Sequence, residues 1–472
     1  MDRTNKYKSL FSTAAIFAIS NVLSKLVLSL LLPLYTRMLT TAQYGTAELL
    51  TTISQLVVPL CSLAIQDSVF RFSMDSKQNP GNVLRNALKV ASFSSCALML
   101  LAVAFNWYEA LSEWKVYFAI ISILSMFRAI FSLYANATHR TMVYSIDSVL
   151  YNSALAVSNV IYLVVFKLGL GGYFLAMITA EVISIAFLFI KCGLWKELKA
   201  SGKDPELLKD MLRYSAPLIL NSISWGLTHV VDKVMLEQYA DSASVGLYSA
   251  ASKIPSLLSV VLSVFSSAWT LSVVRDYEAE KDIAFYKSIF DLQHVGCVFC
   301  AAGILLVNNR VFPWILGDSF AESTVYVPTL LIGTVFLSYT NYFSSIFSAM
   351  KQSKLIMYSA LIGCAVNVVF NYMLIPKIGI HGACIATAFS YVVIAVMRTF
   401  FCEKHFSIGI GYGKWIFSLV ILVALAAAVA VSFYAEICAV VVLAVYTVMY
   451  WKELKSMVGM LLSIVKRKGK NA

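Results

Sequence analysis

Ionisable side chains inside long apolar stretches are the residues of this sequence best suited to do chemistry. They are the cations Lys25, Arg128, Lys233 and Lys253 and the acids Glu48, Asp147, Glu181 and Asp232. A charge at the centre of a membrane-spanning helix costs about 2.5–3.5 kcal/mol on insertion scales, so we expect it to be paired, hydrated or functional. Cations at such positions suit a phosphate or another anion, and acids suit a coupling proton or sodium ion.

The alternative is that these charges neutralise one another inside the protein. Lys233 has a neighbouring acid in Asp232, and Arg128 has two candidate partners on other segments, Asp147 and Glu181. A lysine in the first apolar segment could pair with any acid that faces it. The sequence leaves ligand binding and internal pairing open for each cation.

Composition identifies the elements that must position these charges. Of the 472 residues, 60% are hydrophobic and 13% are charged, and the mean hydropathy is +0.78. This balance excludes a soluble domain of such length and predicts an all-α polytopic membrane protein. A spanning helix needs about 20 mostly apolar residues, and we count fourteen such segments. They begin near Leu10, Tyr44, Asn86, Trp114, Val143, Leu170, Arg213, Val245, Ile289, Val325, Leu355, Ile380, Lys414 and Glu436.

The placement of lysine and arginine predicts the orientation of the chain. An even number of spans puts both termini on one side of the membrane. If that side is the cytoplasm, the inner segments hold 28 basic residues and the outer loops hold 5, which is the bias that the positive-inside rule describes. The net charge of +12 then follows from topology, and it does not indicate nucleic-acid binding.

A decapeptide pattern occurs twice, in residues 167–176 and 377–386. Both copies read Lys-(Leu/Ile)-Gly-(Leu/Ile)-x-Gly-x-x-(Leu/Ile)-Ala, 210 residues apart, and both lie between long apolar stretches. Residues 40–45 correspond in the same way to residues 241–246, each a polar turn followed by a glycine. We infer that spans one to six repeat as spans seven to twelve. Because six is even, the two copies share one orientation and should be related by an axis along the membrane normal.

The repeat predicts four parts of the chain. They are an N-terminal six-helix lobe (1–190), a basic cytoplasmic linker (191–212), a C-terminal six-helix lobe (213–404), and an extra helix pair with a basic cytoplasmic tail (405–472). The linker is either an amphipathic segment at the lipid headgroups or a plain positive loop. The extra pair has no charge within its spans and could face lipid or an acyl chain.

Polar side chains inside the expected spans form stripes at helical spacing. Asn21 in the first span corresponds to Asn221 in the seventh, and serines recur along residues 249–266 of the eighth. Converging stripes predict a hydrated central cavity, and the two asparagines are candidate substrate contacts within it. The alternative is close helix packing by small residues.

Nothing in the sequence predicts a metal site or a bound cofactor. The nine cysteines lie mostly in apolar segments and lack ligand spacing, and the five histidines are scattered. An Asp-x-Asp motif and sizeable extramembrane loops, which membrane glycan polymerases and transferases usually need, are missing from the sequence. We therefore expect a protein that is not an enzyme.

Two segments resemble signatures of bacterial polysaccharide flippases. Residues 32–45 (LPLYTRMLTTAQYG) resemble their helix 1–2 signature. Residues 213–218 (RYSAPL), 231–233 (VDK) and 245–254 (VGLYSAASKI) resemble their helix 7–8 signature. The resemblance covers about the first 400 residues. It places the chain in the multidrug/oligosaccharidyl-lipid/polysaccharide exporter superfamily.

The resemblance implies two lobes around a V-shaped cavity in the bacterial cytoplasmic membrane. It implies alternating-access transport of an undecaprenyl-pyrophosphate-linked oligosaccharide from the inner to the outer leaflet. Lys25, Lys233 and Lys253 would meet the pyrophosphate, a proton or sodium ion could drive the cycle, and a glycan polymerase is a candidate partner. Related lipid II flippases have fourteen helices, the last two forming a groove for the lipid tail. Their arginine-rich first helix is missing here, because Lys25 is the only basic residue in that span.

Three other interpretations compete with a polysaccharide flippase. A multidrug or cation antiporter of the same superfamily would need a dominant buried acid pair and an apolar cavity, whereas the charges here are mixed. A membrane-embedded glycan polymerase lacks its expected motifs. A scaffold for glycan enzymes would have little use for charges within the membrane.

Overall fold

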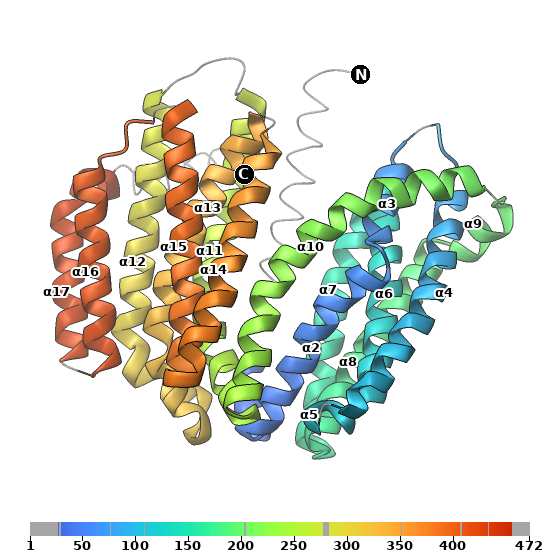
Figure 1. The fold of residues 1–472 in the computed structure, drawn as a ribbon, viewed down its shortest axis with the longest axis horizontal. Helices are drawn as coiled ribbons and strands as arrows, with labels where there is room; N and C mark the ends of the chain where they lie inside the picture. The colour runs from blue at the N-terminus through green and yellow to red at the C-terminus, as the bar shows by residue number, and fades with distance from the viewer. Residues whose placement is uncertain are drawn as a thin grey trace, which may run out of the picture. The chain divides into compact units, whose positions relative to one another are not determined.

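The computed structural model describes residues 27, 30–75, 77–107, 109–202, 204–276, 283–350, 352–405, 408–432 and 434–455. These residues form helices joined by short turns, with no strand among them (Figure 1). The chain divides into two compact units, a first unit of Met1–Gly246 and a second unit of Leu247–Ala472. The all-helical fold predicted from composition is therefore confirmed, and each unit is described separately below.

The described helices follow one another without a large insertion. In the first unit they are α2 (Thr41–Cys61), α3 (Ile65–Ser73), α4 (Pro80–Ala104), η1 (Phe105–Trp107), α5 (Glu109–Ser112), α6 (Lys115–Ala137), α7 (Thr141–Asn159), η2 (Val160–Val165), α8 (Gly169–Lys191), α9 (Leu194–Ala200) and α10 (Pro205–Tyr239). Then come α11 (Ser242–Asp276), which begins in the first unit, α12 (Ile283–Leu316), η3 (Asp318–Val325), α13 (Val327–Ala349), α14 (Ser353–Ile378), α15 (Ile380–His405), α16 (Tyr412–Ala430) and α17 (Ala435–Met449).

Local signals explain where several helices begin. Thr40 accepts a hydrogen bond from the Gln43 backbone N–H at 3.2 Å, and the Gln43 side chain accepts one from the Thr40 N–H at 3.1 Å, which is a capping box for α2. Asp204 caps α10 through the Leu207 N–H at 3.0 Å, and Pro205 occupies the first helical position, where its missing N–H has no cost. The polar segments predicted as turns at residues 40–45 and 241–246 are instead the first turns of helices, because α2 begins at Thr41 and α11 begins at Ser242.

Ten described helices are long and apolar enough to cross a membrane. The bent pair α2 and α3, which meet at 59° after Pro59, would make an eleventh. Three of the predicted fourteen spans remain. Most of the first span lies outside the described residues, and α10 does not meet the same composition criterion. The third, α17, has 15 residues. The chain is a multi-pass membrane protein, and the number fourteen stays a prediction.

The first unit is a bundle in which α8 packs on α6 and α7, and α6 packs on α3 and α4 (Figure 1). Its apolar core joins residues of these helices to the start of α10 through Leu207 and Met211. The linker is bound to the same bundle: Arg85 donates to the Leu198 carbonyl at 2.8 Å and Asn86 donates to the Asp204 carbonyl at 2.7 Å. The beginning of α10 thus packs within the first unit, and the lobe boundaries predicted from the repeat stay a prediction.

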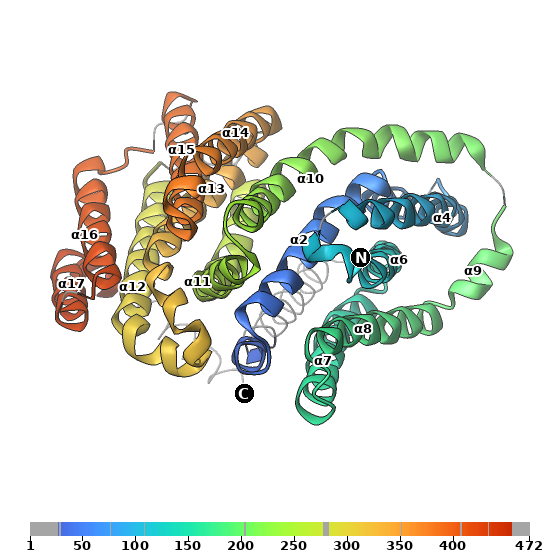
Figure 2. The same ribbon diagram turned by 60° about the horizontal axis from the view of Figure 1, so that its bottom comes forward.

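The second unit packs α13, α14 and α15 together and adds the final pair α16 and α17 against α12 (Figure 2). Buried His294 of α12 joins the parts: Nδ1 lies 2.6 Å from the Tyr339 hydroxyl, and Nε2 lies 2.7 Å from Ser418 Oγ and 2.9 Å from the Tyr450 hydroxyl. A buried imidazole with hydroxyl partners on both nitrogens fixes the final pair to the lobe.

The two decapeptide copies have matching local structure. Gly169 and Gly379, the first glycines of the pattern, both have φ of +55°, which glycine adopts without a steric penalty. A Cβ on Gly172 would lie 3.1 Å from the Tyr162 carbonyl oxygen, and a Cβ on Gly382 would lie 2.8 Å from that of Leu374. The spacing of the pattern therefore places a tight turn and a close helix approach at equivalent points of both copies.

Candidate functional site

The structure describes seven of the eight charged candidates. Lys25 lies outside the described residues, as does Asn21. Asn221 lies on α10, but its side chain is outside the described set. Lys253 lies half-buried on α11 in the second unit. The other candidates form two charged clusters within the first unit.

The first cluster brings Arg128 of α6 between acids of α7 and α8. Its Nε donates to Glu181 Oε2 at 2.7 Å, and its Nη1 lies 3.9 Å from Asp147 Oδ2. The guanidinium also lies 3.9 Å above the Tyr151 ring, one turn after Asp147. The Arg128 side chain is 26% exposed, whereas those of Asp147 and Glu181 are 1% and 3% exposed. Arg128 is therefore paired internally, which is one of the two interpretations that the sequence left open.

Asp147 is the least compensated member of this cluster. Ser184 of α8 donates to Asp147 Oδ1 at 2.5 Å. Its Oδ2 is buried and accepts no hydrogen bond from the described residues. With all three groups ionised, Arg128, Asp147 and Glu181 carry one net negative charge. A proton or a monovalent cation would neutralise it, so the cluster has the chemistry of an ion-binding site.

The second cluster joins Lys233 of α10 to three residues of α2. Lys233 Nζ lies 2.9 Å from Glu48 Oε2, 2.7 Å from Thr52 Oγ1 and 3.4 Å from the Glu48 carbonyl oxygen. The Tyr44 hydroxyl donates to Glu48 Oε1 at 3.1 Å. Glu48 and Lys233 are 8% and 9% exposed, and Asp232 beside Lys233 is buried as well. Sequence reasoning considered Asp232 as the partner of Lys233 and could not identify Glu48, which lies 185 residues away.

Two glycines of the repeat meet next to the second cluster. A Cβ on Gly45 would lie 1.8 Å from the Ser242 carbonyl oxygen, and a Cβ on Gly246 would lie 2.0 Å from the Thr41 carbonyl oxygen. Thr41 corresponds to Ser242, and Gly45 to Gly246, at the offset of 201 residues found in the sequence. The first turns of α2 and α11 therefore cross in a reciprocal contact that only glycine allows.

Sequence reasoning missed Arg398, which the distribution of basic residues had placed in a cytoplasmic segment. It is 1% exposed on α15. Its Nε donates to Ser359 Oγ at 2.8 Å, and its Nη1 donates to the Thr340 carbonyl at 2.9 Å. No carboxylate lies within ion-pair distance among the described residues. A signal was present, since Ala395, Val396 and Met397 precede it and aromatic residues follow.

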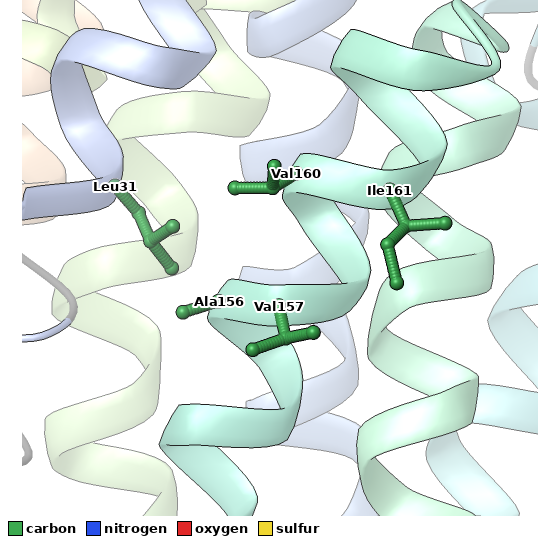
Figure 3. A pocket seen from close by; sticks show the side chains of 5 residues that line it. All are labelled: Leu31, Ala156, Val157, Val160 and Ile161. Atoms are coloured by element: carbon green, nitrogen blue, oxygen red, sulfur yellow. The ribbon is translucent and has the colours of Figure 1, made fainter.

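An apolar pocket of about 290 Å³ lies in the first unit, apart from these charges. Its walls are Leu31, from the helical residues 30–38, and four residues of α7 and η2, namely Ala156, Val157, Val160 and Ile161 (Figure 3). The widened helical turn of η2 begins at Val160. With no polar lining residue, the pocket suits a hydrocarbon chain rather than a sugar or phosphate.

Comparison with known proteins identifies relatives over about half of the chain. An uncharacterised membrane protein of Methanocaldococcus jannaschii is 26% identical over 206 residues, covering 42% of this chain and 47% of the relative. A protein of Haloferax volcanii named a probable low-salt glycan biosynthesis flippase is 21% identical over 249 residues, covering 51% of this chain and 50% of the relative. The chain thus spans about half the length of the curated relatives it matches.

Solved structures share the fold at low sequence identity. An inward-facing multidrug resistance MATE family transporter of the MOP superfamily has a TM-score of 0.70 at 14% identity, covering 83% of this chain and 98% of that one. The lipid II flippase MurJ in an inward closed conformation has a TM-score of 0.68 at 13% identity, covering 94% and 99%. Identities this low show a common fold and nothing more.

Family models complete the comparison. A model named MatE matches residues 217–373. The model described as "Polysaccharide biosynthesis protein" matches residues 10–270, which is more than half of the chain. The chain therefore belongs to the polysaccharide biosynthesis protein family, as a multi-pass membrane protein with the fold of MOP-superfamily transporters.

Proposed function

We propose that this protein is a flippase, and not an enzyme, that moves an undecaprenyl-pyrophosphate-linked oligosaccharide from the inner to the outer leaflet of a bacterial cytoplasmic membrane. The observation that carries the proposal is the match of residues 10–270 to the polysaccharide family. The Haloferax relative named a glycan biosynthesis flippase supports the same class of cargo. Both termini would be cytoplasmic, as the distribution of lysine and arginine predicts.

The physical task is to carry a large polar headgroup across about 30 Å of hydrocarbon. A hydrated path lined by hydroxyls, amides and charges lowers that barrier, while the lipid tail stays in the bilayer. Repeat-related bundles that rock against each other would open this path to one face at a time. The apolar pocket beside Leu31 would suit part of the tail, because its lining offers no polar group.

The candidate residues divide into two roles. Cationic and amide side chains would contact the phosphates and sugars: Lys25, Arg128, Lys233, Lys253, Asn21 and Asn221. The acids Glu48, Asp147, Glu181 and Asp232 would be candidates for a coupling proton or sodium ion. Asp147 is the strongest of these, because its buried Oδ2 accepts no hydrogen bond from the described residues.

Reconstitution tests the proposal directly. Purified protein in liposomes should move a fluorescent undecaprenyl-pyrophosphate-linked oligosaccharide to the opposite leaflet, where an external glycosidase can cleave it. A proton gradient and a sodium gradient, applied separately, would identify the coupling ion. No movement above empty liposomes, with protein that is correctly folded, would refute the flippase assignment.

The second candidate is a multidrug or cation antiporter of the same superfamily. The MatE match over residues 217–373 and the MATE-like fold favour it. An antiporter would lower the intracellular concentration of a fluorescent organic cation in whole cells and would leave the labelled glycolipid in place. The liposome assay and the whole-cell assay together distinguish the candidates.

A further inference from the structure

Where α2 meets α10, the Lys233 ammonium faces a set of oxygen acceptors that resembles a phosphate group. We call Tyr44, Glu48, Thr52 and Lys233 the α2–α10 lock. The Lys233 ammonium has three N–H donors, and the lock offers three oxygens: a carboxylate at 2.9 Å, a hydroxyl at 2.7 Å and a backbone carbonyl at 3.4 Å. Of these three acceptors, only the Glu48 carboxylate carries a charge.

The lock lies on the segment of α2 that is also fixed by the glycine crossing. Gly45 precedes Glu48 by less than one turn, and its close approach to Ser242 leaves no room for a side chain between the helices. A shift of α2 away from α10 would therefore loosen the crossing and the ion pair together. Glu48 is the only acid of α2, so the charge of this helix depends on a single group.

Lys233 of the lock and Arg128 of the first cluster are held by different sets of partners. Arg128 faces two carboxylates, Glu181 and Asp147, and an aromatic ring. Lys233 meets one carboxylate among the three acceptors of the lock. A pyrophosphate diester carries two negative charges, so it would attract the ammonium more strongly than one carboxylate does. A compact, flexible ammonium can follow such an anion, whereas the planar guanidinium of Arg128 is held between Glu181 and the ring of Tyr151.

We propose that the α2–α10 lock is opened by its cargo, because the pyrophosphate of the lipid-linked substrate replaces Glu48 as the anionic partner of Lys233. This inference rests on the proposed flippase function. Glu48 keeps its hydrogen bond from Tyr44 after the exchange, and the cost of leaving its carboxylate without a counterion is offset by the two negative charges that Lys233 then faces. The released α2 then separates from α10, and the movement of the two helices depends on occupancy by an anionic cargo.

Hydrogen exchange and binding test the exchange of partners on the purified full chain. The probe is undecaprenyl pyrophosphate in detergent, and undecaprenol serves as the uncharged control. In the wild-type protein the pyrophosphate should increase amide exchange in residues 41–52, and undecaprenol should not. E48Q, which keeps the shape of Glu48, should show raised exchange without ligand and bind about tenfold more tightly, because no carboxylate competes for Lys233.

A test of Lys233 must separate weaker binding from misfolding. K233M leaves Glu48 buried without its counterion, so the double variant E48Q/K233M is the better test, since it removes both charges. It should fold and bind undecaprenyl pyrophosphate at least tenfold more weakly than E48Q. K414M is the matched control, because Lys414 forms an ion pair with Glu453 at 2.7 Å in the second unit and takes no part in the lock. Its affinity should equal that of the wild type.

The outcomes separate this inference from the proposed function. Binding with unchanged or reduced exchange in residues 41–52, or equal affinity of E48Q and wild type, overturns the exchange of partners and leaves the flippase proposal intact. Equal affinity of E48Q and E48Q/K233M for undecaprenyl pyrophosphate also overturns the exchange of partners and leaves the flippase proposal intact. No binding of the pyrophosphate by the folded wild-type protein overturns both.

Discussion

Replacement of Arg128 by methionine should destabilise the protein and stop transport for two separable reasons. Methionine keeps much of the side-chain volume but removes the charge between Glu181 and Asp147. Those carboxylates are 3% and 1% exposed, so each would remain buried without its cation. Removing one partner of a buried ion pair costs about 3–5 kcal/mol. The lost contact with the Tyr151 ring would add about 0.5–2 kcal/mol.

A second variant separates stability from function. In R128M/E181Q the methionine faces a neutral amide in place of the Glu181 carboxylate, so the part of the lost free energy of unfolding that comes from Glu181 should return, while Asp147 stays without its cation. Denaturant unfolding in detergent, followed by labelling of buried cysteines with a thiol-reactive dye, measures this free energy. The liposome assay measures transport, and we expect none from the double variant if Arg128 contacts the cargo.

Two results would refute this reasoning. If R128M unfolds at the same denaturant concentration as the wild type, the cluster does not compensate its buried acids. If R128M/E181Q transports the labelled glycolipid at the wild-type rate, Arg128 serves only to neutralise Glu181 and is not a substrate contact. R128K is a useful third variant, because it keeps the charge but cannot bridge both acids as a guanidinium does.

The remaining predictions concern glycine packing, a buried arginine and an exposed ion pair. G45A and G246A should each abolish transport, because a methyl group would overlap a carbonyl oxygen of the other helix. The control G413A, which has open space at its Cβ, should keep full activity. Equal activity of all three variants would refute the reciprocal crossing. R398M should lower the free energy of unfolding by about 1–3 kcal/mol per unsatisfied acceptor in the same unfolding assay. An unchanged unfolding midpoint would show that the hydrogen bonds from Arg398 to Ser359 and Thr340 do not stabilise the second unit. K414M should change stability by less than about 1 kcal/mol, because its ion pair is partly exposed, and a larger loss would contradict that assessment.

Long apolar stretches and internal repetition were enough to predict an all-helical membrane fold and the turn that opens each decapeptide copy. The decapeptide pattern placed Gly172 and Gly382 in equivalent positions, and the structure puts both against a carbonyl of the preceding helix. The span expected to begin near Tyr44 corresponds to α2, which begins three residues earlier, at Thr41, after the Thr40 cap. These features depend on residues close together in the sequence, so one sequence is sufficient to predict them.

The partners of the buried charges were harder to predict because they lie on different helices. Nothing local to Lys233 indicates that it meets Glu48, and a neighbouring acid at position 232 suggested a simpler pair. Arg398 was assigned to the cytoplasmic side because it lies near the end of an apolar segment. In the structure α15 continues for seven residues past Arg398, to His405, so Arg398 lies within the bundle. Side-chain pairing across helices depends on packing, which composition and spacing do not specify.

The two decapeptide copies share a local turn, but the helices that follow them carry different charges. The offset of 210 residues that relates the decapeptides relates α8 to α15 as well, so Glu181 corresponds to Tyr391 and Leu188 corresponds to Arg398. The first copy therefore holds an acid that can gain or lose a proton, whereas the second holds a guanidinium that stays charged and donates to neutral oxygens. If transport is driven by an ion, the group that binds it should lie in the first copy. D147N should then abolish the dependence of transport on the proton or sodium gradient, whereas methionine at Arg398 should change stability and leave that dependence unaltered.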